Sequence, residues 1–244
     1  MFYYKLIGET TSDFSKRVSS FNNGKKICIC GKLDPMARGE TKVLIGNEVK
    51  SMDKHLHSNK TYEFYICMGI STDSDDIMGN IENITYNITF IDREKINMYM
   101  ETIVPYIKQQ KFHHFSAKHI TKNNKRKPLW YWYREGDLKE NEIPEKPVRV
   151  YYTKYLNYKI ITSDNYLSLV NRRLNKITEK DKFYIKDIQH SWDKLQQHIP
   201  LILYKYKMKV SSGFYIRMIA KNIKQELNIP VHIFDINRVD VEDV

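Results

Sequence analysis

An acidic residue in a short loop bounded by glycines is the first feature of this sequence that could carry chemistry. Asp34 lies within residues 31–39, which read GKLDPMARG and follow an apolar run at 27–30. Gly31 and Gly39 can adopt backbone angles that other residues avoid, while Pro35 fixes its own φ and restricts Asp34 to extended geometry. A carboxylate held by a rigid loop after a strand predicts a catalytic group, although the same residues also suit a turn or a helix cap.

The net charge indicates the kind of partner. The 244 residues include 40 Lys and Arg against 29 Asp and Glu, which gives a formal net charge of +11. This balance favours a polyanion, either a nucleic acid or an anionic membrane surface. Because no apolar run is long enough to span a membrane and no amphipathic anchor helix stands out, the sequence predicts a nucleic-acid partner and no membrane partner.

Cations and aromatic rings are mixed between residues 111 and 136. Cations neutralise phosphates and flat rings stack on bases, which is the combination that single-stranded or looped RNA requires. We expect a solvated basic loop at 121–127, followed by a helix at 130–136 that buries Trp130 and Tyr133.

The cysteines and the acidic residues do not predict a metal centre. Cys28, Cys30 and Cys67 lie in apolar runs without a cluster of partner ligands, which indicates reduced thiols in the cytoplasm or nucleus. The acidic stretch 71–79 lacks the spacing of an EF-hand, so a turn closed by Asp side chains is expected there. The sequence predicts no metal and no cofactor.

Strands and helices follow one another without a strict βαβ rhythm, which predicts an α+β fold. Along 60–69, Tyr62, Phe64 and Ile66 share one face of a strand. The expected strands cover 2–7, 43–46, 60–69, 148–152, 201–210 and 231–236. The expected helices cover 12–21, 92–108, 130–136, 166–177, 185–198 and a segment that ends at Leu227, and the prolines at 144 and 147 indicate a linker.

Four separated motifs together resemble the TruB-type tRNA pseudouridine-55 synthases. Residues 31–39 resemble the catalytic Gly-x-Leu-Asp-Pro-x-Ala-x-Gly motif, and residues 60–79 look like the second motif of that family. Residues 116–136 are similar to its Ser-Ala…Ala-Arg-x-Gly thumb segment, residues 213–217 match Gly-x-Tyr-Ile-Arg, and Arg238 fits a later arginine. The residues of the Ala-Arg-Gly and Gly-Phe-Tyr-Ile-Arg stretches look nearest to the eukaryotic branch of this family.

The resemblance implies a pseudouridine-synthase fold, in which helices flank a mixed, mainly antiparallel sheet. Residues 111–147, called here the thumb-like segment, would be inserted into it. The implied activity is isomerisation of a uridine flipped out of RNA, first of all uridine 55 in the T-loop of tRNA, with similar mRNA stem-loops as further targets. A monomer is expected, with RNA (the tRNA T-arm, and mRNA) as its partner.

The resemblance also implies roles for individual residues. Asp34 would be the catalytic carboxylate, Arg217 the cation that stabilises its ionised form, and Tyr62 a catalytic ring that lies against the uracil. The implied substrate-binding residues are Tyr215, Lys60, Lys5, Lys118, Lys125, Arg126, Lys127 and Arg134.

The match covers about residues 5–161 and 207–239, which predicts one catalytic domain over 1–244 without a C-terminal RNA-binding domain. Residues 163–200, called here segment 163–200, are predicted to be an insertion. Residues 28–31 read CICG where the family usually has a Gly-His-Thr-Gly run, so Ile29 stands in place of the expected histidine. This departure leaves an alternative open, namely an RNA-binding or RNA-folding module with weak or lost catalysis on the same fold.

Overall fold

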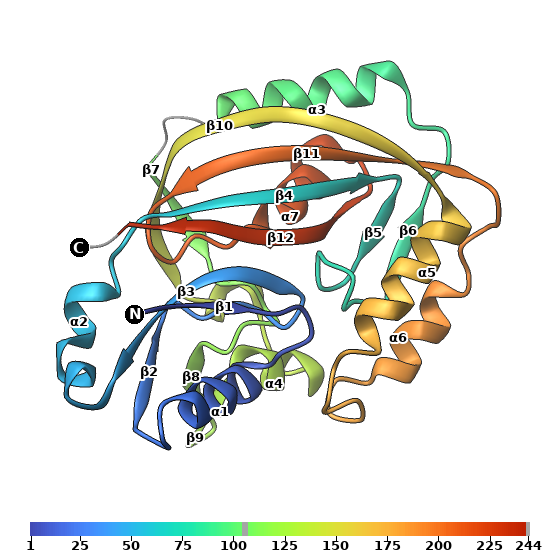
Figure 1. Ribbon diagram of the computed structural model, residues 1–244. Coiled ribbons are helices and arrows are strands. Elements are labelled where there is room, and N and C mark those ends of the chain that lie inside the picture. The colour runs from blue at the N-terminus through green and yellow to red at the C-terminus, as the bar shows by residue number, and fades with distance from the viewer. Residues whose placement is uncertain (104–106, 243–244) are drawn as a thin grey trace.

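Strands from both ends of the sequence form one central sheet (Figure 1). The computed structural model describes residues 1–103 and 107–242. The sheet contains β1 (Phe2–Lys5), β2 (Ile27–Cys30), β3 (Ala37–Ile45), β4 (Lys60–Met68), β7 (Ile107–Lys111), β10 (Glu145–Thr162), β11 (Pro200–Val210) and β12 (Val231–Val241). Two hairpins lie outside it, formed by β5 (Ile70–Thr72) with β6 (Ile81–Ile84) and by β8 (His119–Lys122) with β9 (Lys125–Pro128). The helices are α1 (Thr11–Phe21), α2 (Met52–His55), α3 (Phe90–Thr102), α4 (Leu129–Arg134), α5 (Ser163–Leu174), α6 (Ile185–Trp192) and α7 (Arg217–Leu227), with 3-10 turns at Gly46–Ser51 and Glu140–Glu142.

The strand order confirms the predicted fold class. The sheet runs β1-β3-β12-β4-β11-β10-β7, and β2 pairs with β3 off this path. Among the described strands of this sheet, β12 runs parallel to β3 and the other pairs are antiparallel. The sheet is therefore mixed and mainly antiparallel, with helices on both faces, as predicted for an α+β fold.

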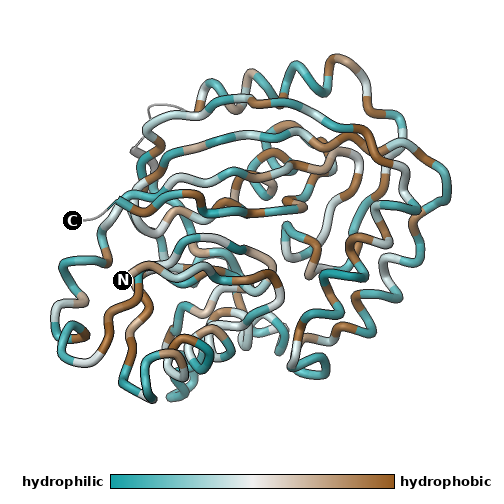
Figure 2. Tube along the Cα trace, in the orientation of Figure 1, coloured by the Kyte–Doolittle hydropathy of each residue, from teal (hydrophilic) through white to brown (hydrophobic). Residues whose placement is uncertain are grey.

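Alternating side chains give the sheet two apolar faces. On β4, Phe64 and Ile66 belong to the core beneath α3 and α7, whereas Cys67 belongs to the core beneath α5 and α6. Trp192 of α6 is fully buried in the second core. Figure 2 shows the corresponding alternation of apolar and polar stretches along α5 and α6. These two cores hold the sheet rigid behind the loops that carry the candidate site.

The loop between β2 and β3 follows a path that its glycines permit. Gly31, at the start of the loop, has a φ of +85°, and Gly39 has a φ of +127°. Arg238 of β12 lies opposite Gly39 in the parallel pairing, and a Cβ at Gly39 would collide with the Arg238 carbonyl. Glycine is required there both for the backbone angle and for the close approach of β12.

Two predictions of local structure are wrong because strand pairing overrides a weak helical or linker signal. The helix expected over 92–108 ends at Thr102, and residues 107–111 form β7; residues 104–106 lie outside the described part. The expected linker near Pro144 becomes the start of β10, whose residues 145–149 pair with β7. Long-range pairing decided both cases.

The thumb-like segment also differs from its predicted form. The expected loop at 121–127 is the β8–β9 hairpin, turned at Asn123 and Asn124, which both have positive φ. Asparagine tolerates this conformation well. The expected helix begins directly after Pro128 and therefore buries Leu129 and Trp132, whereas Tyr133 is exposed.

Candidate active site

Lys5 holds the loop that carries Asp34. Its ammonium donates to the backbone carbonyls of Asp34 (3.0 Å), Pro35 (3.3 Å) and Ala37 (2.7 Å). Burial lowers the pKa of Lys5 to about 8, against the opposing influence of Glu9 and Asp34. Because the buried ammonium is occupied by carbonyls, the structure favours a role for Lys5 in shaping the loop over the predicted contact with RNA.

The Asp34 carboxylate faces Arg217. Nε of Arg217, the first residue of α7, donates to Oδ2 of Asp34 at 2.9 Å. Arg217 is 3% exposed, whereas the Asp34 side chain is 33% exposed. The structure therefore brings together the two residues that the sequence paired, with the carboxylate held from the buried side and open to solvent.

The loop between β5 and β6 encloses the other side of Arg217. Its Nη1 donates to the carbonyl of Ser74 at 3.1 Å, and its Nε lies 3.6 Å from Oδ2 of Asp76. Burial raises the pKa of Asp76, and Arg217 opposes this rise. The neighbouring Asp75 forms an ion pair of 2.8 Å with Lys224 of α7, and burial raises the pKa of Asp75 to about 6. Buried carboxylates are thus matched by cations from one helix.

A histidine of the thumb-like segment reaches the same network. His113 is fully buried, with Nε2 2.9 Å from Oδ2 of Asp75. Its Nδ1 accepts the backbone N–H of Phe115 at 3.1 Å and lies 3.4 Å from Nη1 of Arg217. Burial lowers the pKa of His113 well below its usual value, and Arg217 lowers it further. The start of the thumb-like segment is therefore docked on the acidic loop 73–80.

Two tyrosines lie close to the Asp34–Arg217 pair. Burial raises the pKa of Tyr215 to about 12, and the negative charge of Asp34 acts in the same direction. Tyr62, a buried residue of β4, also raises the pKa of Tyr215. The structure brings both tyrosines to the site, and their contacts with the uracil stay predictions.

Lys146 adds a cation beside Tyr215. Its Nζ lies 4.5 Å from the ring centre of Tyr215 and 4.3 Å from that of Phe112. Burial lowers the pKa of Lys146 to about 8, and Lys118 lowers it further. The two rings partly replace the water that this ammonium has lost.

Two more buried cations support the start of the Asp34 loop. Arg238 donates to the carbonyl of Gly31 at 3.0 Å and to Oγ1 of Thr41 at 2.7 Å. Lys60 lies against Gly31 and donates to the carbonyl of Ser58, and burial lowers the pKa of Lys60 to about 8. As with Lys5, the structure favours a supporting role for Lys60 over the predicted contact with RNA.

Several cations of the thumb-like segment face solvent, whereas Lys122 is paired with Asp137 and Glu142. Lys118 is exposed and lies 5.2 Å from the ring centre of Phe112. The exposed cations of the β8–β9 hairpin are Lys125, Arg126 and Lys127. Because these cations are free of buried partners, they are available to RNA phosphates, as the sequence predicts.

Arg134 connects the thumb-like segment to segment 163–200. Its guanidinium lies 5.5 Å from the ring centre of Trp130 and 4.6 Å from that of Tyr184. Its Nη1 also donates to the carbonyl of Lys182 at 3.1 Å. Arg134 therefore has a packing role that the sequence did not predict, and its contact with RNA stays a prediction.

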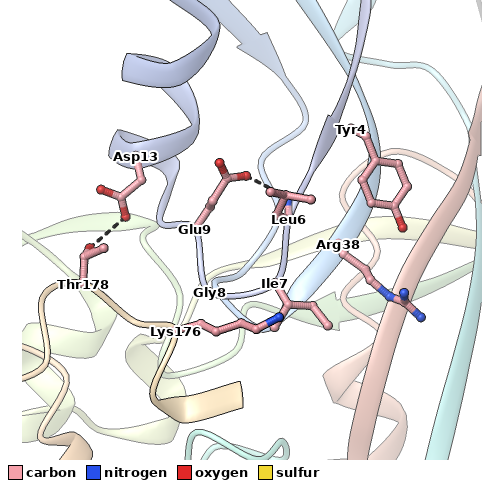
Figure 3. Close-up of a pocket in the computed structure, with 9 residues that line it drawn as sticks. All are labelled: Tyr4, Leu6, Ile7, Gly8, Glu9, Asp13, Arg38, Lys176 and Thr178. Atoms are coloured by element: carbon pink, nitrogen blue, oxygen red, sulfur yellow. Dashed lines mark hydrogen bonds between the residues drawn. The ribbon is translucent and has the colours of Figure 1, made fainter. Parts of the chain in front are cut away.

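Segment 163–200 also packs on the N-terminal turn, where a cavity of about 440 Å³ opens (Figure 3). Thr178 donates to Asp13 at 3.1 Å, and Gly8 lies too close to Lys176 for a Cβ. The lining residues are Tyr4, Leu6, Ile7, Gly8, Glu9, Asp13, Arg38, Lys176 and Thr178. None of the predicted site residues lines this cavity, which marks a packing junction between segment 163–200 and the N-terminal turn.

Neither a metal cluster nor a membrane-spanning helix is found in the described residues. Across residues 1–103 and 107–242, no three His, Cys, Asp or Glu side chains are grouped to hold a metal ion. In the same ranges no helix combines the length and the apolar character needed to cross a bilayer.

Comparison with known proteins decides the family. Residues 19–185 match the family model described as TruB family pseudouridylate synthase (N terminal domain), which is more than half of the chain. The chain belongs to the TruB family. The tRNA pseudouridine synthase B of Prochlorococcus marinus (strain AS9601) is 28% identical over 233 residues, covering 95% of this chain and 60% of that protein. The tRNA pseudouridine synthase B of Mesoplasma florum is 27% identical over 234 residues, covering 96% and 65%.

This TruB-family chain thus spans about three fifths of the length of the first relative and two thirds of the second. Both organisms are bacteria, so these relatives lend no support to the prediction of the eukaryotic branch. A chain in the crystal structure of a Cbf5-Nop10-Gar1 complex superposes with a TM-score of 0.53 at 13% identity, covering 98% of this chain and 47% of that chain. This likeness concerns the fold and agrees with the predicted pseudouridine-synthase-type sheet.

The sequence patterns do not predict the burial and contacts of three groups around the Asp34 loop. The sequence places His113 among the cations and rings expected to contact RNA, Asp76 in a turn closed by Asp side chains, and Lys146 in the expected linker. The available signal was weak: a buried charge needs a partner, and the stretch 71–79 near the second motif carries an excess of carboxylates.

Proposed function

We propose that this TruB-family chain is an RNA pseudouridine synthase whose first target is uridine 55 in the T-loop of tRNA. The reaction breaks the bond between C1′ and N1, turns the uracil, and joins C1′ to C5. The C5 proton is lost and N1 gains one, so the net change is an isomerisation. The observation that supports this proposal best is the Asp34–Arg217 pair, a solvent-open carboxylate held by a buried guanidinium.

The pair and its neighbours can be assigned to steps of this reaction. The Asp34 carboxylate adds to the substrate or stabilises positive charge at C1′ as the glycosidic bond breaks. Arg217 keeps that carboxylate charged and aimed. Tyr62 and Tyr215 supply rings for the flipped uracil, whose extrusion costs roughly a few kcal/mol. Phosphate contacts of the β8–β9 hairpin offset this cost.

A tritium-release assay tests the proposal. The chain is incubated with a T-arm stem-loop that carries tritium at C5 of uridine 55, and released tritium counts turnover. Asp34→Asn, which keeps the size of the side chain, is expected to release none above background. The same variant is expected to bind the stem-loop within about twofold of the wild type, because the phosphate-binding hairpin is unchanged. Turnover by Asp34→Asn would refute the assignment.

The second candidate is an RNA-binding or RNA-folding module that has lost efficient catalysis. The features that favour it are Ile29, in place of the histidine expected before the Asp34 loop, and the long segment 163–200. Tight binding of the T-arm by the wild type without release of tritium would establish this alternative.

Similar stem-loops in mRNA are proposed as further substrates. Transcriptome-wide pseudouridine mapping with and without the protein identifies them. We also propose a monomer in a reducing compartment, the cytoplasm or nucleus, in keeping with the free thiols of Cys28, Cys30 and Cys67.

A further inference from the structure

The imidazole of His113 contacts both the acidic loop and the arginine of the candidate catalytic pair. Its Nε2 lies 2.9 Å from Asp75, and its Nδ1 lies 3.4 Å from Nη1 of Arg217. Nε of the same guanidinium donates to Asp34 at 2.9 Å. A short series of hydrogen bonds therefore runs from the thumb-like segment to the carboxylate proposed to act on the uridine.

The groups around the ring determine where its proton lies. A guanidinium can only donate, so Nη1 of Arg217 and the N–H of Phe115 both direct a hydrogen at Nδ1 of His113. Nδ1 must then hold a lone pair, and the single ring proton lies on Nε2, where it is donated to Asp75. The network assigns a neutral imidazole in the Nε2–H form, which its full burial also favours.

An acceptor at Nδ1 of His113 restricts the orientation of the Arg217 guanidinium. Nη1 is shared between the carbonyl of Ser74 and the ring of His113, which leaves Nε for Asp34. Because the guanidinium is planar, it cannot rotate Nε away from Asp34 and keep both contacts of Nη1.

The contacts of His113 lead to one helix, α7, by two routes. Asp75, which accepts from His113, also pairs with Lys224 at 2.8 Å. Lys224 and Arg217 both belong to α7 (Arg217–Leu227). The imidazole thus contacts α7 directly at Arg217 and, through Asp75, at Lys224, and its position is defined relative to Arg217.

We propose that His113 is a positioning residue. By accepting from Nη1 it sets the orientation of Arg217 toward Asp34, so that docking of the thumb-like segment on the acidic loop completes the catalytic pair. The proposal rests on the proposed pseudouridine synthesis for its kinetic test.

Two variants test the contacts of the two ring nitrogens separately. In His113→Asn the amide oxygen takes the place of Nδ1 and can accept from Arg217, but the side chain is too short to reach Asp75. In His113→Gln the amide nitrogen takes the place of Nε2 and can donate to Asp75, but no acceptor faces Arg217. We expect His113→Gln to lower the single-turnover rate by about 10- to 100-fold. His113→Asn should remain within about threefold of the wild type, and both variants should bind the T-arm with a Kd within about twofold.

His57→Gln, a change of an exposed histidine in the turn after α2, is the matched control and should turn over at the wild-type rate. A ring that acts only as an anchor on Asp75 gives the reverse order, with His113→Gln active and His113→Asn impaired, and that result overturns the proposal. Equal loss or equal retention in the two variants also overturns it.

A measurement on the wild type keeps the proposal testable if the variants do not fold. Long-range ¹H–¹⁵N correlation spectra distinguish the two tautomers and the imidazolium. At about pH 5.5, roughly one unit below the usual histidine pKa, we expect a neutral His113 protonated on Nε2. A proton on Nδ1 contradicts the proposal. This spectrum does not depend on turnover, so a wild type that releases no tritium refutes the proposed function and leaves the tautomer test standing.

Discussion

Nε of Arg217 and Oδ2 of Asp34 lie 2.9 Å apart, although 183 positions separate the two residues. The sheet order explains the meeting. Helix α7 leads into β12, and β12 pairs with β3 directly after the Asp34 loop. The polypeptide therefore returns the start of α7 to the loop before β3, and the pair depends on the same strand pairing that defines the fold.

Replacing Arg217 by lysine is expected to keep most of the stability and to abolish most turnover. An ammonium preserves the positive charge near Asp34 and Asp76 but cannot donate to Asp34, Ser74 and His113 together. We expect the single-turnover rate to fall by about 100-fold or more. The free energy of unfolding, measured with urea, should change by less than about 1.5 kcal/mol. Arg217→Ala leaves the buried carboxylate of Asp76 without its cation and should cost about 3 kcal/mol or more. Wild-type turnover by Arg217→Lys would exclude the orienting role.

Removing one cation from the β8–β9 hairpin should weaken RNA binding and leave chemistry intact. Lys125 is exposed, so Lys125→Ala removes a charge without disturbing packing. The slope of log Kd against log salt should decrease in magnitude by about 1 for each lost phosphate contact. Filter binding between about 50 and about 200 mM salt measures it. Lys54→Ala, at an exposed lysine of α2, is the control and should leave the slope unchanged. An unchanged slope in Lys125→Ala would mean that Lys125 of the hairpin does not contact RNA phosphates.

An alanine at Gly39 is expected to destabilise the protein by more than about 3 kcal/mol. The position has a φ of +127°, and the new Cβ would meet the backbone carbonyl of Arg238. Gly24 is the matched control, because it has a φ of +71° with nothing within 4 Å of the added Cβ. Gly24→Ala should cost only about 1 kcal/mol for the left-handed backbone. Equal losses in urea unfolding would mean that β12 can move away from β3 at little cost.

The buried ammonium of Lys60 predicts a rise of stability with pH. Burial lowers the pKa of Lys60 from 10.5 to about 8. Between these values the unfolded chain binds more protons than the folded protein, so the Lys60 contribution to the free energy of unfolding increases with pH. Relative to Lys60→Met, the wild type should gain roughly 2 to 3 kcal/mol between about pH 7.5 and about pH 10. Urea unfolding of both proteins across this range measures the gain, and a constant difference would contradict the burial of a charged Lys60.

Local chemistry made the Asp34 loop predictable from the sequence. The positive φ of Gly31 and Gly39 follows from the residue type and from the turn between two apolar runs. The spacing of Tyr62, Phe64 and Ile66 on one face likewise predicted β4, which the structure places at Lys60–Met68. In each case the residue types and spacing that carry the prediction lie within a few positions of one another.

Long-range burial made other parts of the site unpredictable. His113 and Asp75 are 38 positions apart, and nothing near either residue indicates that both side chains are excluded from water. Lys5 resembles a surface cation, because the carbonyls that bind it converge only after the Asp34 loop has folded. Sequence patterns record periodicity and residue type, whereas these groups depend on the assembled sheet.

The placement of β12 between β3 and β4 has a consequence for biosynthesis. Residues 231–241 are translated long after both of their neighbouring strands. Until then, the backbone N–H and C=O groups of β3 and β4 that pair with β12 have no partner. Nascent chains with such edges are prone to mispairing and depend on protection by chaperones. We expect the active-site loop to acquire its final form only once this strand has emerged from the exit tunnel, so a stalled or shortened translation product would be inert.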